Sequence, residues 1–414
     1  MERMKYFLYY FALIFTSVSL FFWSFTQTDK NLYFFSHPLF VQFQERMWMV
    51  SRSTNSWVYI LLILLSFALY VFYLREKNAS SENKQLRIAV FACCAALLLF
   101  SNNALSHDLF NYMFNAKAVL VYGQDPHVRS ALEIAPSDEW VRFMHNVHTT
   151  APYGYVWTYL SLVPSMLGFD KFITTFLAFK LSMVLGFFVL LWLQFQVYLQ
   201  QKKNGIKKNV VFSLIPFALN PLVVIETCMN GHNDVWMMVF AFGSFWLLFQ
   251  SRKLFSFQSI ISLVLLFISI QIKEATLVLV PIWGLLLFWK LEKKTVLHPL
   301  LKKCLRFFGE NWAELSALAL LLPLVTERSQ QFNPWYLIWS LTFLPFLSSK
   351  MLRYFLLTLS FTSCLRYLPF LLEGGYSDTI QLQMRLITWS AVPIFFLLYF
   401  GIQFRSSRKT KNAT

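Results

Sequence analysis

The sequence predicts an all-α, multi-pass membrane protein, and three observations lead to that class. Of the 414 residues, 57% are hydrophobic and only 14% are charged, which is too little polar surface for a soluble domain. The apolar residues gather in runs of about 20, the length of a helix that crosses a bilayer. Lys and Arg concentrate in alternate segments between these runs. The net charge of +16 therefore bears on topology and does not indicate a nucleic-acid partner.

About twelve candidate spans follow one another along the chain. The first is basic and then apolar without a small-residue cleavage site, so we expect an uncleaved span. We expect one integral membrane domain, with two spans in 1–87, a core in 88–336 that includes an outer loop at 106–171, and C-terminal spans in 337–414. The candidate spans lie near 6–25, 57–74, 88–105, 172–198, 209–227, 234–250, 256–271, 275–290, 311–325, 335–348, 353–371 and 385–403.

The distribution of Lys and Arg predicts the orientation. An even number of spans places both termini on one side, and the positive-inside rule makes that side cytoplasmic. Six of the seven histidines, all but His298, lie in the alternate segments, so we expect any chemistry on the outer face, in a bacterial-type cytoplasmic membrane rather than the ER. The basic segments are the N-terminus, 74–87, 200–209, 251–253, 290–306, 348–353 and 405–414.

The apolar stretch 151–169 does not fit this scheme as a span. It contains Pro164, and a full crossing would move the basic segment 200–209 outside. We therefore expect a re-entrant or surface-lying helix. Its first residues, "APYG", are typical of a tight backbone element that delivers Tyr155, Trp157 and Tyr159 to the interface.

No metal site or disulfide framework is indicated. The five cysteines lie mostly in apolar runs without metal-ligand spacing. His145 and His148 have the spacing of a helical metal pair, but no third ligand is specified, and a surface pair is the simpler interpretation.

The stretch "ALSHDLFNYMFNAKAVLVYGQDPH", residues 104–127, follows the third candidate span. Its apolar spacing predicts an amphipathic helix over 109–122 in the membrane interface, begun by Ser106 or Asp108 and ended by Gly123. Two interpretations of Asp108 remain open. It either caps this helix, worth about 1 kcal/mol, or acts at headgroup depth as a general base, worth about 10²–10⁴-fold in rate.

Further polar residues fall on the expected outer side. Glu226 near the end of a span is costly unless it has a role. "NGHND" is a tight turn that begins the next span, and its Asn and His residues suit an anion better than Asp234 does. Each has an ordinary structural alternative as a turn or cap.

Several cations and aromatic residues lie near the same side. Lys273, beside Glu274, is either a polar hairpin tip or the neutraliser of a phosphate. "TERSQQFNPWYLIW" contributes Arg328 and a Pro334-Trp335-Tyr336 span start, which any span could show. Lys180 and Arg366 either snorkel or line a headgroup cavity.

These residues resemble a known family. "SHDLFNYMFNAKAVLVYGQDPH" resembles the Ser-x-Asp…Tyr…Gly-x-Asp-Pro-Tyr pattern of polyprenol-phosphate-mannose-dependent α-1,6-mannosyltransferases, membrane glycosyltransferases of the GT-C class. "TTAPYGYVWTYL" is similar to their Ala-Pro-Tyr-Gly-Pro-Leu element, and "NPLVVIETCMNGHNDVWM" to their Asn-Pro-Leu…Gly-His-Asn-Asp element. "IKEATLVLVP" and "FNPWYLIW" resemble their later Lys and Pro-Trp-Tyr motifs. The likeness runs in order from about Ser106 to Tyr336.

The resemblance implies a GT-C-like fold with a large catalytic outer loop carrying interfacial helices, and Asp108 as the acidic residue in that first large outer loop. Two positions depart from the pattern and bear on donor or acceptor choice: His127 replaces Tyr, and Tyr155-Val156 replaces Pro-Leu. "SHD" lacks a paired Asp-x-Asp, so a divalent metal is an alternative that the sequence does not indicate. We place the donor phosphate and sugar among His107, Tyr112, Tyr153, Asn230, His232, Asn233, Lys273, Arg328 and Trp335.

We therefore expect an inverting glycosyltransferase that moves a hexose, mannose by the resemblance, from a polyprenyl-phosphate donor to a glycan or glycolipid acceptor. Membrane lipids are the other expected partners. A transporter or flippase of lipid-linked sugars would instead need opposed broken helices and polar residues near mid-bilayer. An O-antigen ligase or polymerase would take a diphosphate donor.

Overall fold

The computed structural model describes residues 2–75, 81–203, 210–251, 253, 255–292, 298–326 and 332–411. Every regular element in these ranges is a helix, so the predicted all-α class is confirmed for this part of the chain. Parts of the predicted basic segments, at 76–80, 204–209, 293–297 and 412–414, lie outside the described residues.

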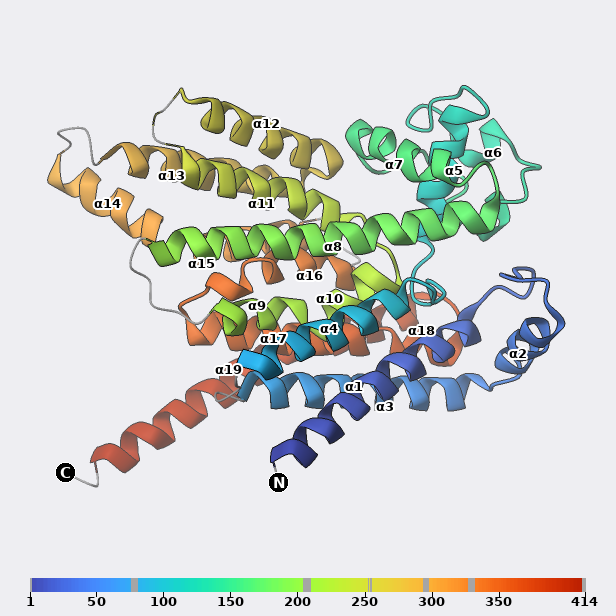
Figure 1. The fold of residues 1–414 in the computed structure, drawn as a ribbon, viewed down its shortest axis with the longest axis horizontal. Helices are drawn as coiled ribbons and strands as arrows, with labels where there is room; N and C mark the ends of the chain where they lie inside the picture. Colours follow the sequence, from blue (N-terminus) through green and yellow to red (C-terminus); the bar gives the residue numbers. More distant parts are fainter. Residues whose placement is uncertain are drawn as a thin grey trace.

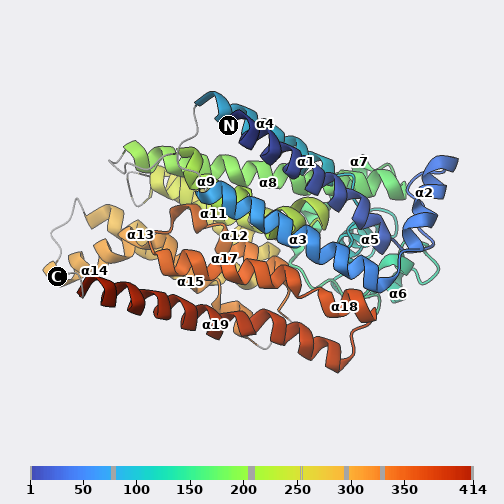
Figure 2. The same ribbon diagram turned by 90° about the horizontal axis from the view of Figure 1, so that it is seen from below.

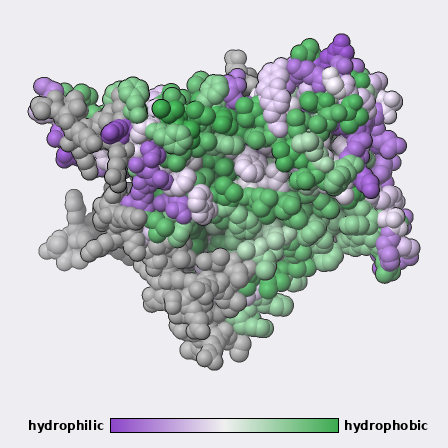
Figure 3. Space-filling model, turned by 45° about the horizontal axis from the view of Figure 1, so that its top comes forward, coloured by the Kyte–Doolittle hydropathy of each residue, from purple (hydrophilic) through white to green (hydrophobic). Residues whose placement is uncertain are grey.

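Five helical stretches among the described residues are long and apolar enough to cross a membrane. They are Phe7–Gln27, Arg52–Arg75, Phe172–Gln201, Lys350–Glu373 and Asp378–Ile402. The helices that form them are α1 (Glu2–Ser24), α3 (Arg52–Arg75), α8 (Phe172–Lys203), α17 (Lys350–Leu365) with α18 (Leu368–Glu373), and α19 (Asp378–Lys411). In the view of Figure 3, a broad apolar surface separates more polar ends, as a protein embedded in lipid requires.

Several predicted spans are not continuous helices. The span expected near 209–227 breaks at Asn220-Pro221, because the proline ring has no N–H to continue the first helix. Its pieces are α9 (Val210–Ala218), α10 (Pro221–Val224) and a π-turn, η3 (Ile225–Met229). The segments near 311–325 and 335–348 are likewise divided at prolines, into α15 (Trp312–Ala319) and η5 (Leu322–Val325), and into η7 (Pro334–Tyr336), α16 (Leu337–Leu341) and η8 (Leu344–Phe346).

The helices form two groups around these broken segments (Figures 1 and 2). One group contains α8, α11 (Asp234–Gln250), α12 (Phe257–Ile272) and α13 (Val280–Glu292), and α11 packs on both α12 and α8. The other contains α1, α3, α4 (Ser81–Leu98), α17 and α19, and α1 packs on α3 and α4. The start of α1, the end of α19 and α14 (Pro299–Glu310) lie toward one end of the molecule, away from α2 (Pro38–Trp48) and α5–α7 (Figure 1).

The opposite end of the molecule is built from the predicted outer loop. It contains α5 (Asp108–Leu120), α6 (Ala131–Ile134), η2 (Val141–Phe143) and α7 (Tyr155–Leu167). With 13 residues, α7 is about 20 Å long, shorter than the hydrocarbon core of a bilayer. This length suits a helix that does not cross the bilayer.

The surface position expected for the helix over 109–122 is wrong. Most of α5 is buried, because it packs against α7 and α8 rather than lying on the surface. The charged Lys117 suggested a solvated face on this helix. Its ammonium instead pairs with Asp138 at 2.8 Å and lies over the Trp140 ring. Gly123 ends the segment with a positive φ of 58°, as expected.

Candidate functional site

Asp108 is the first residue of α5, and it does not cap the helix. The cap position belongs to His107, and the Asp108 amide donates to Ser106 Oγ at 3.2 Å. The carboxylate instead accepts a hydrogen bond from the Tyr153 hydroxyl at 2.9 Å. Its side chain is 18% exposed, so the carboxylate is mostly enclosed but keeps an accessible edge, which we call its open edge. The capping interpretation is therefore wrong.

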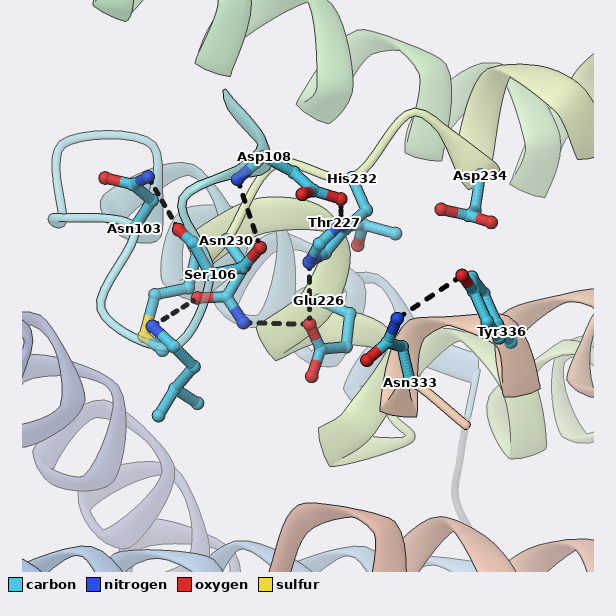
Figure 4. Close-up of polar contacts among 12 residues, drawn as sticks. Asn103, Ser106, Asp108, Glu226, Thr227, Asn230, His232, Asp234, Asn333 and Tyr336 are labelled. Atoms are coloured by element: carbon cyan, nitrogen blue, oxygen red, sulfur yellow. Dashed lines mark hydrogen bonds and ion pairs between the residues drawn. The ribbon is translucent and has the colours of Figure 1, made fainter. Parts of the chain in front are cut away.

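A buried chain of charged groups extends inward from Asp108 (Figure 4). His232 Nδ1 lies 3.6 Å from Asp108 Oδ2, and His232 Nε2 lies 3.3 Å from Glu226 Oε2. His232 and Glu226 are fully buried. Glu226 also accepts hydrogen bonds from Asn230 Nδ2 and from the Tyr367 hydroxyl, both at 2.8 Å. Since His232 separates the two carboxylates, these three groups do not converge on one point.

The two acids and the imidazole set one another's protonation. Burial raises the pKa of Asp108, but hydrogen bonding and charge from His232, with help from Lys273, outweigh it and hold the pKa below its ordinary value. Burial lowers the pKa of His232, but Asp108 and Glu226 outweigh it and raise the pKa above 6.5. The two carboxylates therefore favour the imidazolium form of His232.

The turn that carries His232 depends on its glycine. Gly231 has a φ of 77°, in the left-handed region that glycine alone adopts without strain. Asn230 Oδ1 accepts a hydrogen bond from the Leu105 amide at 3.2 Å, which joins this turn to the loop before Asp108. The turn predicted from "NGHND" is thus confirmed, and it brings His232 beside an acid more than a hundred residues earlier.

Gly231→Ala is expected to lower the free energy of unfolding by about 1–3 kcal/mol and to reduce activity. A Cβ at this position would lie 2.9 Å from Leu109 Cδ1 and would also strain the backbone. Thermal unfolding in detergent measures the effect. Gly284→Ala is the matched control, because a Cβ there meets nothing within 4 Å. Equal melting temperatures for the two variants would contradict the prediction.

A second polar cluster lies beside this chain. Lys273 Nζ donates to Asp234 Oδ2 at 2.8 Å, and Asp234 Oδ1 accepts from Trp339 Nε1 at 2.6 Å. The Lys273 ammonium lies 5.2 Å from the Tyr153 ring centroid and 5.6 Å from that of Tyr336. Lys273 is therefore part of a partly buried site and is not a free polar hairpin tip.

Backbone contact joins the two halves of the site. The Gly154 amide donates to the Ile272 carbonyl at 3.1 Å, and a Cβ on Gly154 would lie 1.9 Å from the Gln271 oxygen. Tyr153 and Lys273 are the neighbours of these two bonded residues. The tight backbone element expected at "APYG" is present, although it buries Trp157 instead of delivering it to the surface.

Most of the predicted site residues come together. Trp335 stacks on His232 with ring centroids 3.8 Å apart, and Tyr112 donates to Asn233 Oδ1 at 3.2 Å. The Asn233 amide nitrogen is buried and has no hydrogen-bond partner in the part of the chain that the structure describes, which leaves it available to a ligand. Arg328 lies outside the described residues.

Two predicted cations play other roles. Lys180 is fully buried, donates to the Met229 carbonyl and lies 3.4 Å from Ser101 Oγ, so it does not snorkel. Arg366 donates to Thr388 Oγ1 at 3.3 Å.

His145 and His148 lie in a loop, so they are not a helical pair. Across the described ranges no group of three potential metal ligands occurs.

Sequence reasoning missed the partners of the central chain. Glu226 was noted only as a costly acid, and Tyr367, Trp339 and Tyr336 were not placed in the site. An acid near the end of an apolar span was itself a signal, since such residues are rarely kept without a partner.

Comparison with known proteins identifies the family. Residues 13–289, about two thirds of the chain, match the family model described as alpha-(1->6)-mannopyranosyltransferase, N-terminal domain. The chain belongs to this family. No curated protein and no solved structure matches it. The matched range of this mannosyltransferase-family chain includes Asp108, Glu226, His232 and Lys273, so the buried chain and the lysine cluster both lie within the shared region.

Proposed function

We propose that the protein transfers mannose from a polyprenyl-phosphate donor to a hydroxyl of a glycan or glycolipid acceptor, with inversion, on the non-cytoplasmic face. The observation that carries the proposal is the Asp108 carboxylate. It is ionised, it is held by Tyr153 and His232, and it keeps an open edge at the end of the molecule opposite to the start of α1 and the end of α19.

Asp108 acts as the general base. The acceptor oxygen attacks the anomeric carbon of mannose while the bond from that carbon to the phosphate oxygen breaks. The polyprenyl monophosphate leaves with the bonding electrons, and the proton of the acceptor hydroxyl passes to Asp108. Because the carboxylate has a low pKa, it takes this proton late, as the new bond forms. One displacement inverts the configuration, so an α product requires a β-linked donor.

Tyr153 and His232 hold the base in place. Their contacts leave the exposed edge of Asp108 free to meet the acceptor hydroxyl and fix the direction of its lone pairs. Glu226 acts through His232, because its charge keeps the imidazole protonated. It is a positioning residue and does not touch the reacting atoms.

The donor phosphate lies toward Lys273. Asp234 and the Trp339 indole hold this ammonium at one edge of the site, where it faces the departing negative charge. Asn233, whose buried amide nitrogen is available, donates to a phosphate or sugar oxygen. The three chain groups Asp108, His232 and Glu226 carry a net negative charge, which suits the positive charge that develops on the sugar ring.

The test is a transfer assay with the full-length protein in liposomes. The donors are polyprenyl-phosphate mannose, a polyprenyl-diphosphate sugar and GDP-mannose, and octyl α-mannopyranoside is the acceptor. We expect a new α-linkage, read by NMR, from the monophosphate lipid alone. Transfer from the diphosphate lipid or from the nucleotide sugar would overturn the donor assignment, and retention of configuration would overturn the mechanism.

The broken segments α9–α10 and α15–η5 are a feature that the transporter alternative would also require. The same liposomes separate the two functions. Movement of the lipid-linked sugar between leaflets without formation of a linkage would favour transport.

A further inference from the structure

A group of aromatic rings lies near Asp108. His107 and His145 stack with centroids 3.8 Å apart and planes 14° from parallel. Tyr376 lies edge-on to His145 at 6.4 Å and stacks on Phe370 at 4.7 Å. We call these four residues the aromatic ledge. It joins three segments that are far apart in the sequence: the loop before α5, the loop after η2, and the end of α18 with the connection to α19.

The ledge is accessible and faces the base. Tyr376 is 50% exposed, and His145 is also exposed. His107 immediately precedes Asp108 in the chain, and its Nδ1–H donates to the Phe143 carbonyl at 2.8 Å, which fixes the ring. The negative charge of Asp108 also acts on the pKa of His145 and of Tyr376. Asp108 therefore lies close to the ledge as well as to Tyr153 and His232.

We propose that the aromatic ledge binds a pyranose ring of the acceptor and directs one of its hydroxyls to Asp108; this inference rests on the proposed function. Stacked rings offer flat apolar faces to the C–H face of a sugar, while the imidazole nitrogens and the phenol supply hydrogen bonds at the edges. His107 is accordingly assigned to the acceptor rather than to the donor.

The charge of the ledge favours a neutral ligand. Partial desolvation by the surrounding protein and the neighbouring His107 lower the pKa of His145 to about 4, and desolvation lowers the pKa of His107. Partial desolvation and the charge of Asp108 raise the pKa of Tyr376 to about 12. At neutral pH the four rings of the ledge therefore carry no charge themselves, which suits a hydroxyl-rich sugar, and the cation that acts on Tyr376 is Arg366.

The position of the ledge in the chain also fits a role in acceptor choice. Asp108, His107 and His145 lie inside the matched range 13–289, whereas Phe370 and Tyr376 lie beyond it. The base thus belongs to the part shared with the family, and half of the ledge comes from the part outside the match. A chain can change this half without altering its base.

The experiment measures acceptor and donor kinetics separately in the full-length protein. With saturating polyprenyl-phosphate mannose, Tyr376→Ala and His145→Ala are each expected to raise the KM for octyl α-mannopyranoside about three- to tenfold and to leave the donor KM unchanged. Tyr376→Phe, which keeps the ring, is expected to retain most of the acceptor affinity. Tyr354→Ala is the matched control, because Tyr354 is similarly exposed, at 52%, on α17. Thermal unfolding checks that each variant is folded.

Binding of octyl α-mannopyranoside, followed by saturation-transfer NMR without donor, separates this inference from the proposed function. One result is that the wild type binds the mannoside, that Tyr376→Ala and His145→Ala fail to bind it, and that none of the three proteins transfers mannose. That result would support the acceptor role of the ledge and contradict the donor assignment. An acceptor KM and binding signal that both variants leave unchanged, or a rise in the donor KM instead, would overturn the ledge.

Discussion

Asp108→Asn is expected to lower kcat for mannosyl transfer by a factor of about 10²–10⁴. The amide cannot accept the proton of the acceptor hydroxyl, although its oxygen can still accept the Tyr153 hydrogen bond. Substrate binding depends on other groups, so both KM values are expected to change little. Initial rates over a range of both substrates measure the effect.

The control for this variant is Asp170→Asn. Asp170 is an exposed acid just before α8, 3.9 Å from the Lys117 ammonium, and its positive φ of 55° is one that asparagine also tolerates. We expect its kcat to match that of the wild type. An Asp108→Asn protein that melts like the wild type and still transfers mannose at the wild-type rate would remove the general base from the mechanism.

Glu226→Gln is expected to shift the alkaline limb of the pH–rate profile to lower pH, by about one pKa unit or more. Below its raised pKa, His232 is an imidazolium that contacts both carboxylates. Removing the buried negative charge of Glu226 withdraws one of the two interactions that hold this pKa up. Between 6.5 and the raised pKa of His232 the variant is expected to be slower than the wild type, and at lower pH the difference between the two is expected to narrow.

The direction of the pH dependence follows from the two shifts. The pKa of Asp108 is depressed, so its contribution to stability is complete above the ordinary value of 3.8 and is lost as the pH falls through the lowered pKa. The pKa of His232 is raised, so its contribution is complete below 6.5 and is lost as the pH rises through the raised pKa. Activity and stability should therefore share a plateau between 3.8 and 6.5 that extends a little beyond each limit.

Tyr367→Phe is the control for Glu226. It removes one hydrogen bond to the carboxylate but keeps the charge, so the alkaline limb should move less than in Glu226→Gln. NMR titration of His232 gives the pKa directly. An unchanged His232 pKa in Glu226→Gln would show that the acid is only a structural partner of Tyr367 and Asn230.

The parts of the site that lie in short local motifs could be predicted from the sequence. Asp108 begins a helix because a polar Ser-His-Asp interrupts an apolar run, and Gly231 makes a turn because of its neighbours. The pairing of Tyr367 with Glu226 joins residues 141 positions apart. The hydrophobic periodicity of the sequence gives no information about contacts between residues so far apart. The predicted surface position of α5 failed for the same reason, because the partner of Lys117 comes from a later loop.

The continuity of the helices was predicted less well than the helical class. Long apolar runs such as Phe172–Gln201 are evident from composition alone. By contrast, Asn220-Pro221 can begin a span or divide one, and hydropathy does not distinguish these outcomes. The observed break places Glu226 and the His232 turn at the end of a short helical piece.

The bond between Gly154 and Ile272 joins the backbone beside Tyr153 to the backbone beside Lys273. Under the proposed function, a lipid phosphate that moves Lys273 would also move the backbone segment that carries Tyr153, since each side chain is one residue away from the shared bond. An empty enzyme and a loaded one would then hold Asp108 differently. Such mechanical coupling would make the two substrates bind in a preferred order.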